Sequence, residues 1–381
     1  MQICFFGSYD KYYSRNQIIL KGLAINHVLV VEVHLDLPKS EISEEEHLTM
    51  SIMIKRLLRK LKLIPIVFKN LGNIRHSDLI FSAFPTHLDL PLAYIISKLF
   101  GKPLVFDPLY ALSTVFVSEF GLLSDSSRRA KLLRWIDKIV FRLPDIILFD
   151  TEISRDYYRK LFQIPLEKTR ILYLGADDSI YKFSGIDPSK KTLTVVYYGL
   201  YNPMHGVEHI IECANLCRDD HDIKFFLIGK GQTYLKNKKR ADELKLQNVV
   251  FLPEVTEKDA DKYLKSSDVF LGFLNTSLSA DIDVPNKVFQ GLAMGKAVVT
   301  AETPVTRATF KHKENIYLCK LSDARFLYEV ILELKKDIGL RKKIADNGYA
   351  LYKEKFTPKI IGNDLKVTCE DAIKKNDSYF S

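Results

Sequence analysis

A short helix that runs directly into a buried strand is predicted by the segment Asp281-Ile-Asp-Val-Pro-Asn-Lys-Val-Phe-Gln-Gly-Leu-Ala-Met-Gly-Lys-Ala-Val-Val-Thr300. Pro285 and Asn286 suit the start of a helix, and Gly295 suits its end. Residues 297–300 form an apolar run of the kind found in parallel strands, which are covered on both faces. The segment therefore indicates an α/β protein with a parallel sheet.

Lys287 falls in the first turn of this predicted helix, where a cation opposes the helix dipole unless an anion shares the site. We therefore interpret it as a phosphate-binding residue, and the alternative is a solvated surface lysine. Gln290 lies three residues later on about the same face, so its amide could reach hydroxyl groups of a ligand held by Lys287.

The same alternation of strand and helix extends in both directions from this segment. Strands are predicted at residues 3–6, 28–33, 79–82, 103–106 and 145–149, and again at 194–198, 224–228, 248–252, 268–273 and 297–300. Between them, residues 177–191 are rich in Asp, Ser, Gly, Pro and Lys, as in a hinge. We predict two Rossmann-like parallel-sheet domains that face each other across a cleft, where such folds bind ligands.

Composition narrows the class of protein. The 381 residues are 47% hydrophobic and 27% charged, which excludes disordered, collagen-like and disulfide-scaffold chains. No apolar run approaches the roughly 18 residues of a membrane span. Five cysteines without a C-x-x-C pair indicate reduced thiols and no zinc site, and the N-terminus is typical of a strand and not of a signal peptide. A cytoplasmic location is expected, and the net charge of +9 favours an anionic partner.

Two loops that follow predicted strands could receive an anion through backbone N–H groups. Gly199 leads through Asn202-Pro-Met-His-Gly206 into a helix, where His205 would add a donor. The alternative is an ordinary turn punctuated by proline and glycine. Gly229-Lys-Gly231 follows the next strand, with Lys230 as a point charge.

In these segments the chain resembles glycosyltransferase family four, the retaining nucleotide-sugar enzymes of the GT-B fold. The resemblance is strongest in Tyr198-Gly-Leu-Tyr-Asn-Pro-Met-His-Gly-Val-Glu208, Leu227-Ile-Gly-Lys-Gly231, residues 267–273 and residues 285–299. It implies an acceptor domain over 1–180, a linker over 181–190, a donor domain over 191–357 and a last helix, 358–381, that crosses back to the first domain. It also implies transfer of a hexose-type sugar with no cofactor and no required metal.

The chain departs from the family at charged positions. The family has an Arg and a Lys in its first donor loop, where this chain has Leu200 and His205. Lys287, Lys230 and Arg15, which follows Gly7-Ser8, are the candidate replacements.

Two family glutamates also differ, because the matching positions here are Ile282 and Gln290. Gln290 could still bind a ribose diol, and Asp281 or Asp283 could supply the carboxylate. From the resemblance and the loops together, eleven residues are expected to bind the nucleotide-sugar donor. They are Gly7, Arg15, Gly199, His205, Gly229, Lys230, Gly231, Asp283, Asn286, Lys287 and Gln290.

Two residues are candidates for the catalytic step. Sugar transfer from a nucleoside diphosphate builds negative charge on the leaving phosphate, which Lys287 and a helix N-terminus could stabilise. Asp107 follows the strand at 103–106 and is expected to point into the cleft on the acceptor side. Its alternative role is to cap a turn before Pro108.

A basic stretch in the first domain suggests a membrane surface. No acidic residue occurs from His47 to Ser77, and Lys55, Arg56, Arg59, Lys60 and Lys62 alternate there with aliphatic residues. Such a helix could bind anionic lipid, and residues 128–135 form a second basic segment around the only tryptophan. Ordinary solvated helix faces are the alternative. On the membrane interpretation, the acceptor is a lipid-linked sugar or glycolipid used in cell-surface glycan synthesis.

The sequence also bears on three other classes of function. A nicotinamide-dependent oxidoreductase would need G-x-G-x-x-G after its first strand, which is absent here. A nucleic-acid partner is not expected, since the cations lie beside aliphatic and not aromatic residues. A non-catalytic GT-B protein, or a subunit that only binds a nucleotide sugar, stays open because Leu200, Ile282 and Gln290 occupy altered positions.

Overall fold

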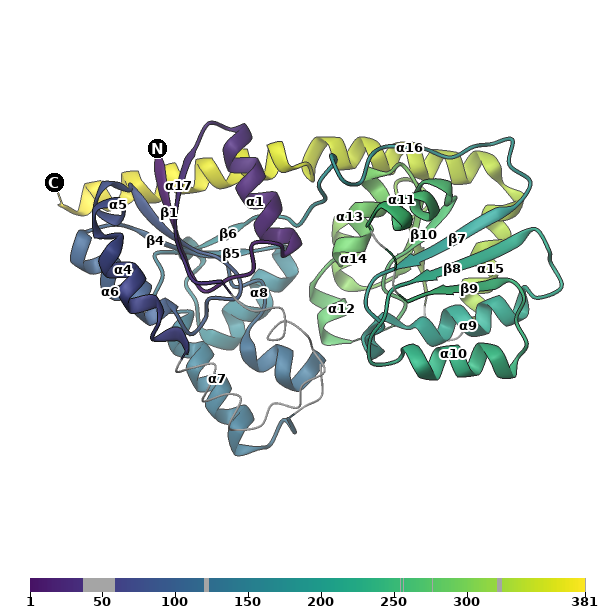
Figure 1. Cartoon of the computed structure of the whole chain (residues 1–381), viewed down its shortest axis with the longest axis horizontal. Coiled ribbons are helices and arrows are strands. Elements are labelled where there is room, and N and C mark those ends of the chain that lie inside the picture. The colour runs from purple at the N-terminus through teal and green to yellow at the C-terminus, as the bar shows by residue number, and fades with distance from the viewer. Residues whose placement is uncertain are drawn as a thin grey trace. The chain divides into compact units, whose positions relative to one another are not determined.

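The chain forms two compact units, each built around one parallel sheet of six strands (Figure 1). The computed structural model describes residues 1–36, 59–119, 123–253, 255, 257–275, 277–320 and 324–380. The first unit comprises Met1–Tyr173 and Pro358–Ser381, and the second comprises Leu174–Thr357. The predicted α/β class with two parallel sheets is confirmed.

The first sheet has the strand order β2-β1-β3-β4-β5-β6. Its strands are β1 (Gln2–Gly7), β2 (Leu29–His34), β3 (Leu79–Ser82), β4 (Leu104–Phe106), β5 (Ile146–Phe149) and β6 (Thr169–Ile171). The α-helices of this unit are α1 (Ser14–Ile25), α4 (Leu63–Lys69), α5 (Leu71–His76), α6 (Leu90–Phe100), α7 (Arg128–Val140), α8 (Glu152–Phe162) and α17 (Pro358–Phe380). A π-helix, η1 (Thr114–Glu119), and a 3-10 turn, η2 (Leu166–Lys168), complete it.

The second sheet has the order β12-β11-β10-β7-β8-β9. Its strands are β7 (Leu193–Tyr198), β8 (Ile223–Ile228), β9 (Val249–Leu252), β10 (Val269–Leu271), β11 (Ala297–Ala301) and β12 (Tyr317–Cys319). The helices are η3 (Pro203–His205), α9 (Val207–Leu216), α10 (Tyr234–Glu243), α11 (Glu257–Ser266), α12 (Leu278–Ile282), α13 (Asn286–Ala293), α14 (Pro304–Thr309), α15 (Ala324–Lys336) and α16 (Ile338–Lys355).

Alternate residues of each central strand pack against different helix layers. In β1, Ile3 and Phe5 belong to a core shared with α1 and α17, whereas Cys4 and Phe6 belong to a core shared with α4, α5 and α6. Every residue of β3, β4 and β5 is buried, as expected for parallel strands covered on both faces. Because helices cover both faces of the sheet, ligands can bind only at its edge, where loops follow the carboxyl ends of the strands.

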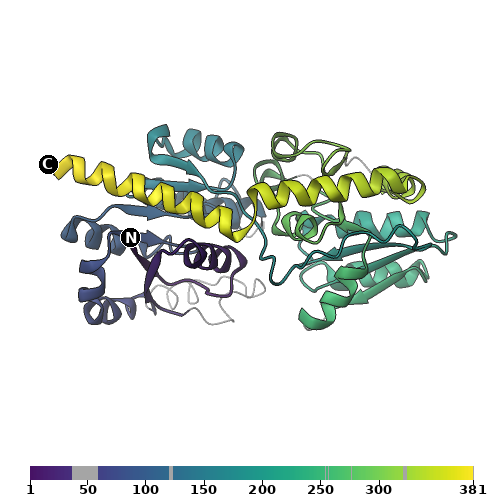
Figure 2. The same cartoon turned by 90° about the horizontal axis from the view of Figure 1, so that it is seen from above.

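The contact between α1 and α17 depends on two glycines. A Cβ atom placed on Gly362 would lie 2.1 Å from the carbonyl carbon of Gly22, so the helix backbones touch there without intervening side chains. Figure 2 shows α17, in yellow, running along the first unit beside α1. Ile361, Leu365 and Cys369 extend this buried seam. The final helix predicted from the sequence therefore packs on the first unit.

The segment expected to be a linker, residues 181–190, packs on the second unit. The N–H groups of Ser184 and Gly185 donate to the Met294 carbonyl oxygen, each at 3.1 Å. The ring of Phe183 lies 4.4 Å from that of Tyr349, and Lys296 Nζ donates to the Gly185 oxygen at 2.6 Å. These contacts tie the segment to the end of α13 and to α16.

Replacing Gly362 by Ala is expected to destabilise the first unit, because the new methyl group must push α1 and α17 apart. Overpacking of this kind costs about 1–3 kcal/mol. The matched control is Gly72→Ala in α5, where a Cβ would meet no atom within 4 Å and alanine favours the helix. Urea unfolding of both variants measures the difference. Equal stability of the two variants would contradict the close helix crossing.

Candidate functional site

Three loops meet at the carboxyl edge of the second sheet, after β7, β8 and β10. Gly199 and Gly229 have φ angles of 144° and 125°, which favour glycine. A Cβ on Gly229 would lie 2.0 Å from the Gly199 carbonyl oxygen, so the first two loops are in direct contact. Tyr201 N–H donates to the Lys230 carbonyl oxygen at 2.9 Å, and Leu274 N–H donates to the His205 oxygen at 3.1 Å. The predicted loops therefore form one continuous backbone surface.

Lys287 lies behind this surface, in the first turn of α13. Its Nζ atom is 4.1 Å from the centroid of the Tyr197 ring and 5.4 Å from that of Phe273. The same atom is 3.3 Å from His205 Nδ1 and would be 3.0 Å from a Cβ on Gly199. Lys287 as a whole is only 6% exposed. The structure thus brings together three residues that the sequence assigned to the donor: Gly199, His205 and Lys287.

The electrostatics of this cluster are unusual because its cation is unbalanced. Burial holds the pKa of Lys287 well below its ordinary value, and no carboxylate in the described part of the chain offsets that effect. Burial, and then the charge of Lys287, also hold the pKa of His205 well below 6.5. A buried cation is costly unless it is paired, so this geometry is suited to an anion that arrives from outside.

His205 is held in place by several contacts. Its Nδ1 atom is 2.8 Å from Tyr197 Oη and also contacts the Leu200 carbonyl oxygen. Its ring stacks on Phe273 with centroids 4.5 Å apart. Tyr197 and Phe273 were not predicted as site residues, because both lie in apolar strand-like runs where the sequence pattern indicates only core. No local signal in the sequence distinguishes them from core aromatics.

The remaining predicted donor residues of the second unit differ in exposure. Asp283 and Gln290 are buried, at 2% and 8% exposed. Asn286 Oδ1 is buried and has no hydrogen-bond partner within the described ranges. Asp283 also lines a narrow crevice that is too tight to hold a water molecule, together with Phe273, Ala280, Pro285, Thr300, Ala301, Thr303 and Thr306. Lys230 is exposed and Gly231 has a φ angle of 145°.

The predicted residues of the first unit are engaged with one another. Arg15 donates to both oxygens of Asp107, from Nε at 2.6 Å and from Nη2 at 2.7 Å, and Nη2 also donates to the Leu172 carbonyl oxygen. Both side chains are buried. Gly7 has a φ angle of 121°, and the next residue, Ser8, donates its N–H to Asp89 Oδ2 at 2.8 Å. The roles assigned to Arg15 in phosphate binding and to Asp107 in catalysis stay predictions, and the structure shows that the two residues neutralise each other.

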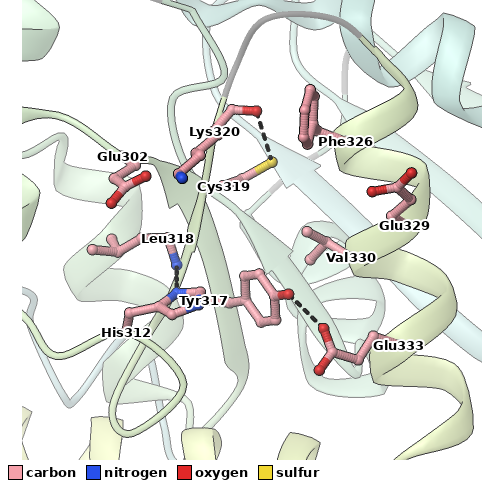
Figure 3. Close-up of a pocket in the computed structure, with 10 residues that line it drawn as sticks. All are labelled: Glu302, His312, Tyr317, Leu318, Cys319, Lys320, Phe326, Glu329, Val330 and Glu333. Atoms are coloured by element: carbon pink, nitrogen blue, oxygen red, sulfur yellow. Dashed lines mark hydrogen bonds between the residues drawn. The ribbon is translucent and has the colours of Figure 1, made fainter.

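A larger pocket of about 430 Å³ lies between β12 and α15 in the second unit (Figure 3). Its wall carries Glu302, Glu329 and Glu333, and Tyr317 Oη donates to Glu333 Oε2 at 2.5 Å. Carboxylates repel a diphosphate, so this pocket is not suited to the predicted donor. None of the residues predicted from the sequence lines it.

No metal site was expected, and the described ranges gather no group of three or more His, Cys, Asp or Glu side chains that could hold a metal ion.

Parts of the chain are similar to glycosyl transferases of group 1. Residues 181–351 match the family model described as glycosyl transferases group 1. WcaI of Escherichia coli (strain K12), named as a glycosyl transferase of colanic acid biosynthesis, is 32% identical over 116 residues, which are 30% of this chain and 28% of WcaI. The alpha-D-kanosaminyltransferase of Streptomyces kanamyceticus is 26% identical over 150 residues, or 36% of this chain and 38% of that protein. The matches thus span about a third of each relative's length.

Solved structures show that the whole chain has the GT-B fold that the sequence predicts. Anabaena Alr3699/HepE in complex with UDP and glucose has a TM-score of 0.70 at 18% identity, covering 97% of this chain and 100% of that one. Sucrose-phosphate synthase from Thermosynechococcus elongatus has a TM-score of 0.70 at 12% identity, covering 98% and 99%. At such identities the likeness establishes the fold alone.

Replacing Lys287 by Met is expected to raise the thermal stability of the ligand-free protein, because it keeps the aliphatic stem and removes an unbalanced buried charge. The unfolded chain holds this lysine's proton up to pH near 10, whereas the folded chain releases it at lower pH. The unfolded state therefore binds more protons, and the wild-type protein gains stability as pH rises through that window. The advantage of the variant should be largest near neutral pH and should shrink toward pH 10.

Melting temperatures of both proteins at pH 7, 8 and 9 check this prediction. Burial also lowers the pKa of Lys296 to about 8, but that residue is common to both proteins and cancels in the comparison. A variant that is less stable than the wild type at every pH would show that the Lys287 charge is balanced in the free protein.

Proposed function

We propose that the chain is a glycosyltransferase that moves a sugar from a nucleoside-diphosphate sugar to an acceptor with retention of configuration. The observation that carries this proposal is the Lys287 ammonium group, buried beside the start of α13 with no carboxylate partner among the described residues. A diphosphate supplies the missing negative charge. The first N–H groups of α13 and the loops after β7 and β8 supply further donors.

Lys287 and His205 could stabilise the negative charge that the reaction builds on the leaving diphosphate. When the bond between the sugar and its diphosphate breaks, the electron pair moves onto the phosphate, and the fixed cation stabilises that charge without reorganisation. His205 lies 3.3 Å from Lys287, so a protonated His205 would supply the charge that the family obtains from a lysine at this position. The Asn286 and Gln290 amides are placed on the same helix to bind hydroxyl groups of the nucleotide.

The altered positions favour one alternative, a GT-B protein that binds a nucleotide sugar without transferring it. Ile282 is buried and apolar where the family has a glutamate near the sugar, so this chain lacks that carboxylate. Asp283, the next residue, is buried and could replace it. Transfer to a supplied acceptor separates the enzyme from the binding subunit.

We further propose a lipid-linked sugar or glycolipid as the acceptor, bound by the first unit and drawn from an anionic membrane. The support is the basic stretch, although Lys55 and Arg56 lie outside the described residues. Lys60 Nζ binds both oxygens of Asp89 at 3.0 Å, and Arg59 Nη2 donates to the Asp36 carbonyl oxygen at 2.9 Å. Those two residues are therefore engaged in the fold, and Lys62 is exposed.

Donor binding is tested by thermal shift with a panel of UDP-, GDP- and ADP-sugars. A ligand at 100 times its dissociation constant adds about 2.7 kcal/mol to stability, and the right donor should produce a shift of that size. Lys287→Met should abolish the shift, whereas Lys236→Gln, which removes an exposed lysine of α10, should leave it unchanged. An undiminished shift in Lys287→Met would remove Lys287 from the phosphate site.

Donor affinity is expected to fall as pH rises from about 6 to 9. An anion beside Lys287 and His205 raises both lowered pKa values, so the complex binds more protons than the free protein. By linkage, binding is then favoured at low pH. Isothermal titration in two buffers of different ionisation enthalpy measures the proton uptake directly. Binding that exchanges no protons would show that the ligand does not approach this pair.

A further inference from the structure

The helices on one side of the first sheet expose large apolar side chains to solvent. The exposed residues lie before and within α4, within α6 and within α7: Leu61, Ile64, Phe68, Ile95, Leu99, Leu132, Trp135 and Ile139. We refer to these eight residues as the outer apolar set. Phe68, Leu99 and Trp135 are 68%, 73% and 60% exposed. Single exposed apolar residues are common, but rows on neighbouring helices mark interaction surfaces.

The spacing shows that each row forms a second face of its helix. In α7, the buried face consists of Ala130, Leu133, Asp137 and Val140, and Leu132, Trp135 and Ile139 repeat at three and four residues on another side. The inward residues Val67 of α4, Ile96 of α6 and Val140 of α7 belong to one core. These helices therefore cover the same face of the sheet, away from α17 (Figure 1). The outer apolar set lies on the exposed sides of these helices.

The charge of this helix layer has one sign. Within α4, α5, α6 and α7 the one acidic residue is Asp137, which is buried and accepts hydrogen bonds from the N–H groups of Leu112 and Ser113 at 3.1 and 2.8 Å. Cations surround the outer apolar set: Lys62, Lys69, Lys98, Arg128, Arg129, Lys131, Arg134 and Lys138. Lys98 and Arg134 have acidic partners outside these helices, at Asp145 and Asp125.

We infer that the outer faces of α4, α6 and α7 dock on an anionic lipid bilayer, with the outer apolar set at the acyl boundary and the lysines and arginines at the headgroups. Apolar side chains flanked by cations, with a tryptophan among them, are the chemistry of an interfacial membrane site. Each cation near an anionic surface contributes about a fivefold gain in binding. The described helices include none that is long and apolar enough to span the bilayer, so the contact is peripheral.

The same observations disfavour two other occupants. A second copy of the chain would bring one predominantly basic face against another, which repels. A nucleic acid would match the charge and its bases could stack on Phe68 and Trp135, but the six aliphatic side chains of the set would have no partner, since base stacking uses aromatic rings. The inference deepens the proposed membrane-derived acceptor, on which it rests, by naming the surface of the first unit that contacts the lipid, and it requires no sugar nucleotide.

Trp135 is the only tryptophan of the chain, so its fluorescence reports directly on this surface. With vesicles of phosphatidylcholine containing about a third phosphatidylglycerol, at low salt, its emission should shift to the blue and become protected from iodide quenching. Vesicles of phosphatidylcholine alone should produce a much smaller change, and added salt should reverse the effect.

Two variants of α7, each with a matched control on α10, test whether this surface contacts the vesicle. Lys131→Gln with Lys138→Gln removes two exposed or half-exposed cations of α7 and should weaken vesicle binding about 25-fold. The matched control, Lys236→Gln with Lys239→Gln on α10 of the second unit, should bind as the wild type does. Leu132→Ser should reduce vesicle flotation, whereas Leu235→Ser, at a 79% exposed position of α10, should not.

Several results would overturn the inference. They are an unchanged spectrum with anionic vesicles, a blue shift with DNA in place of vesicles, or a blue shift that follows protein concentration without lipid. Because no donor is added, a failure here leaves the proposed transfer reaction untouched, and a failure to bind sugar nucleotide leaves the vesicle result untouched.

Discussion

A buried ammonium group without an acidic partner is the constraint that organises the carboxyl edge of the second sheet. Lys287 Nζ lies between the rings of Tyr197 and Phe273, which stabilise a cation only weakly compared with the water it has lost. The nearest polar side chain, His205, is itself a base. Burial therefore favours the uncharged form of the lysine more than the two rings favour the charged form, and an incoming anion would stabilise the charged form. Because Gly199 and Gly229 have no side chains, the loops after β7 and β8 touch each other, and Lys287 Nζ lies close to Gly199.

In the first unit, by contrast, the buried cation has an acidic partner. Arg15 and Asp107 form a two-point ion pair with both side chains buried, so the charge is balanced within the fold. Removing one partner of such a pair leaves an uncompensated charge and is strongly destabilising. Loss of activity in an Arg15 or Asp107 variant would therefore be ambiguous. The contrast between a paired and an unpaired buried cation separates a structural role from a binding role without reference to any relative.

Sequence periodicity was sufficient for most of the fold, and it failed where elements are short. The strands at 194–198 and 224–228 correspond to β7 and β8, because continuous apolar runs leave no other assignment. Two of the three-residue strands, β6 and β12, and the short helices α12 and α14 were not predicted, whereas β4 and β10, equally short, were predicted because they lie in longer apolar runs. The final helix, expected over 358–381, is α17 and ends at Phe380.

The site was predictable as a set of loops but not as a set of contacts. His205 and Lys287 were both assigned to the donor, yet their 3.3 Å approach spans 82 positions of sequence and depends on the sheet order. The Arg15–Asp107 pair spans 92 positions, and the sequence instead assigned these residues to different substrates. The role of Tyr197 and Phe273 as walls around the ammonium group depends on packing that no local pattern encodes.

A crystal structure of the chain with bound UDP tests the central claim most directly. The account predicts diphosphate oxygens within hydrogen-bonding distance, about 2.7–3.2 Å, of Lys287 Nζ and of the first N–H groups of α13. A structure in which the diphosphate binds away from Lys287, with the ammonium group still buried between the two rings, would contradict it.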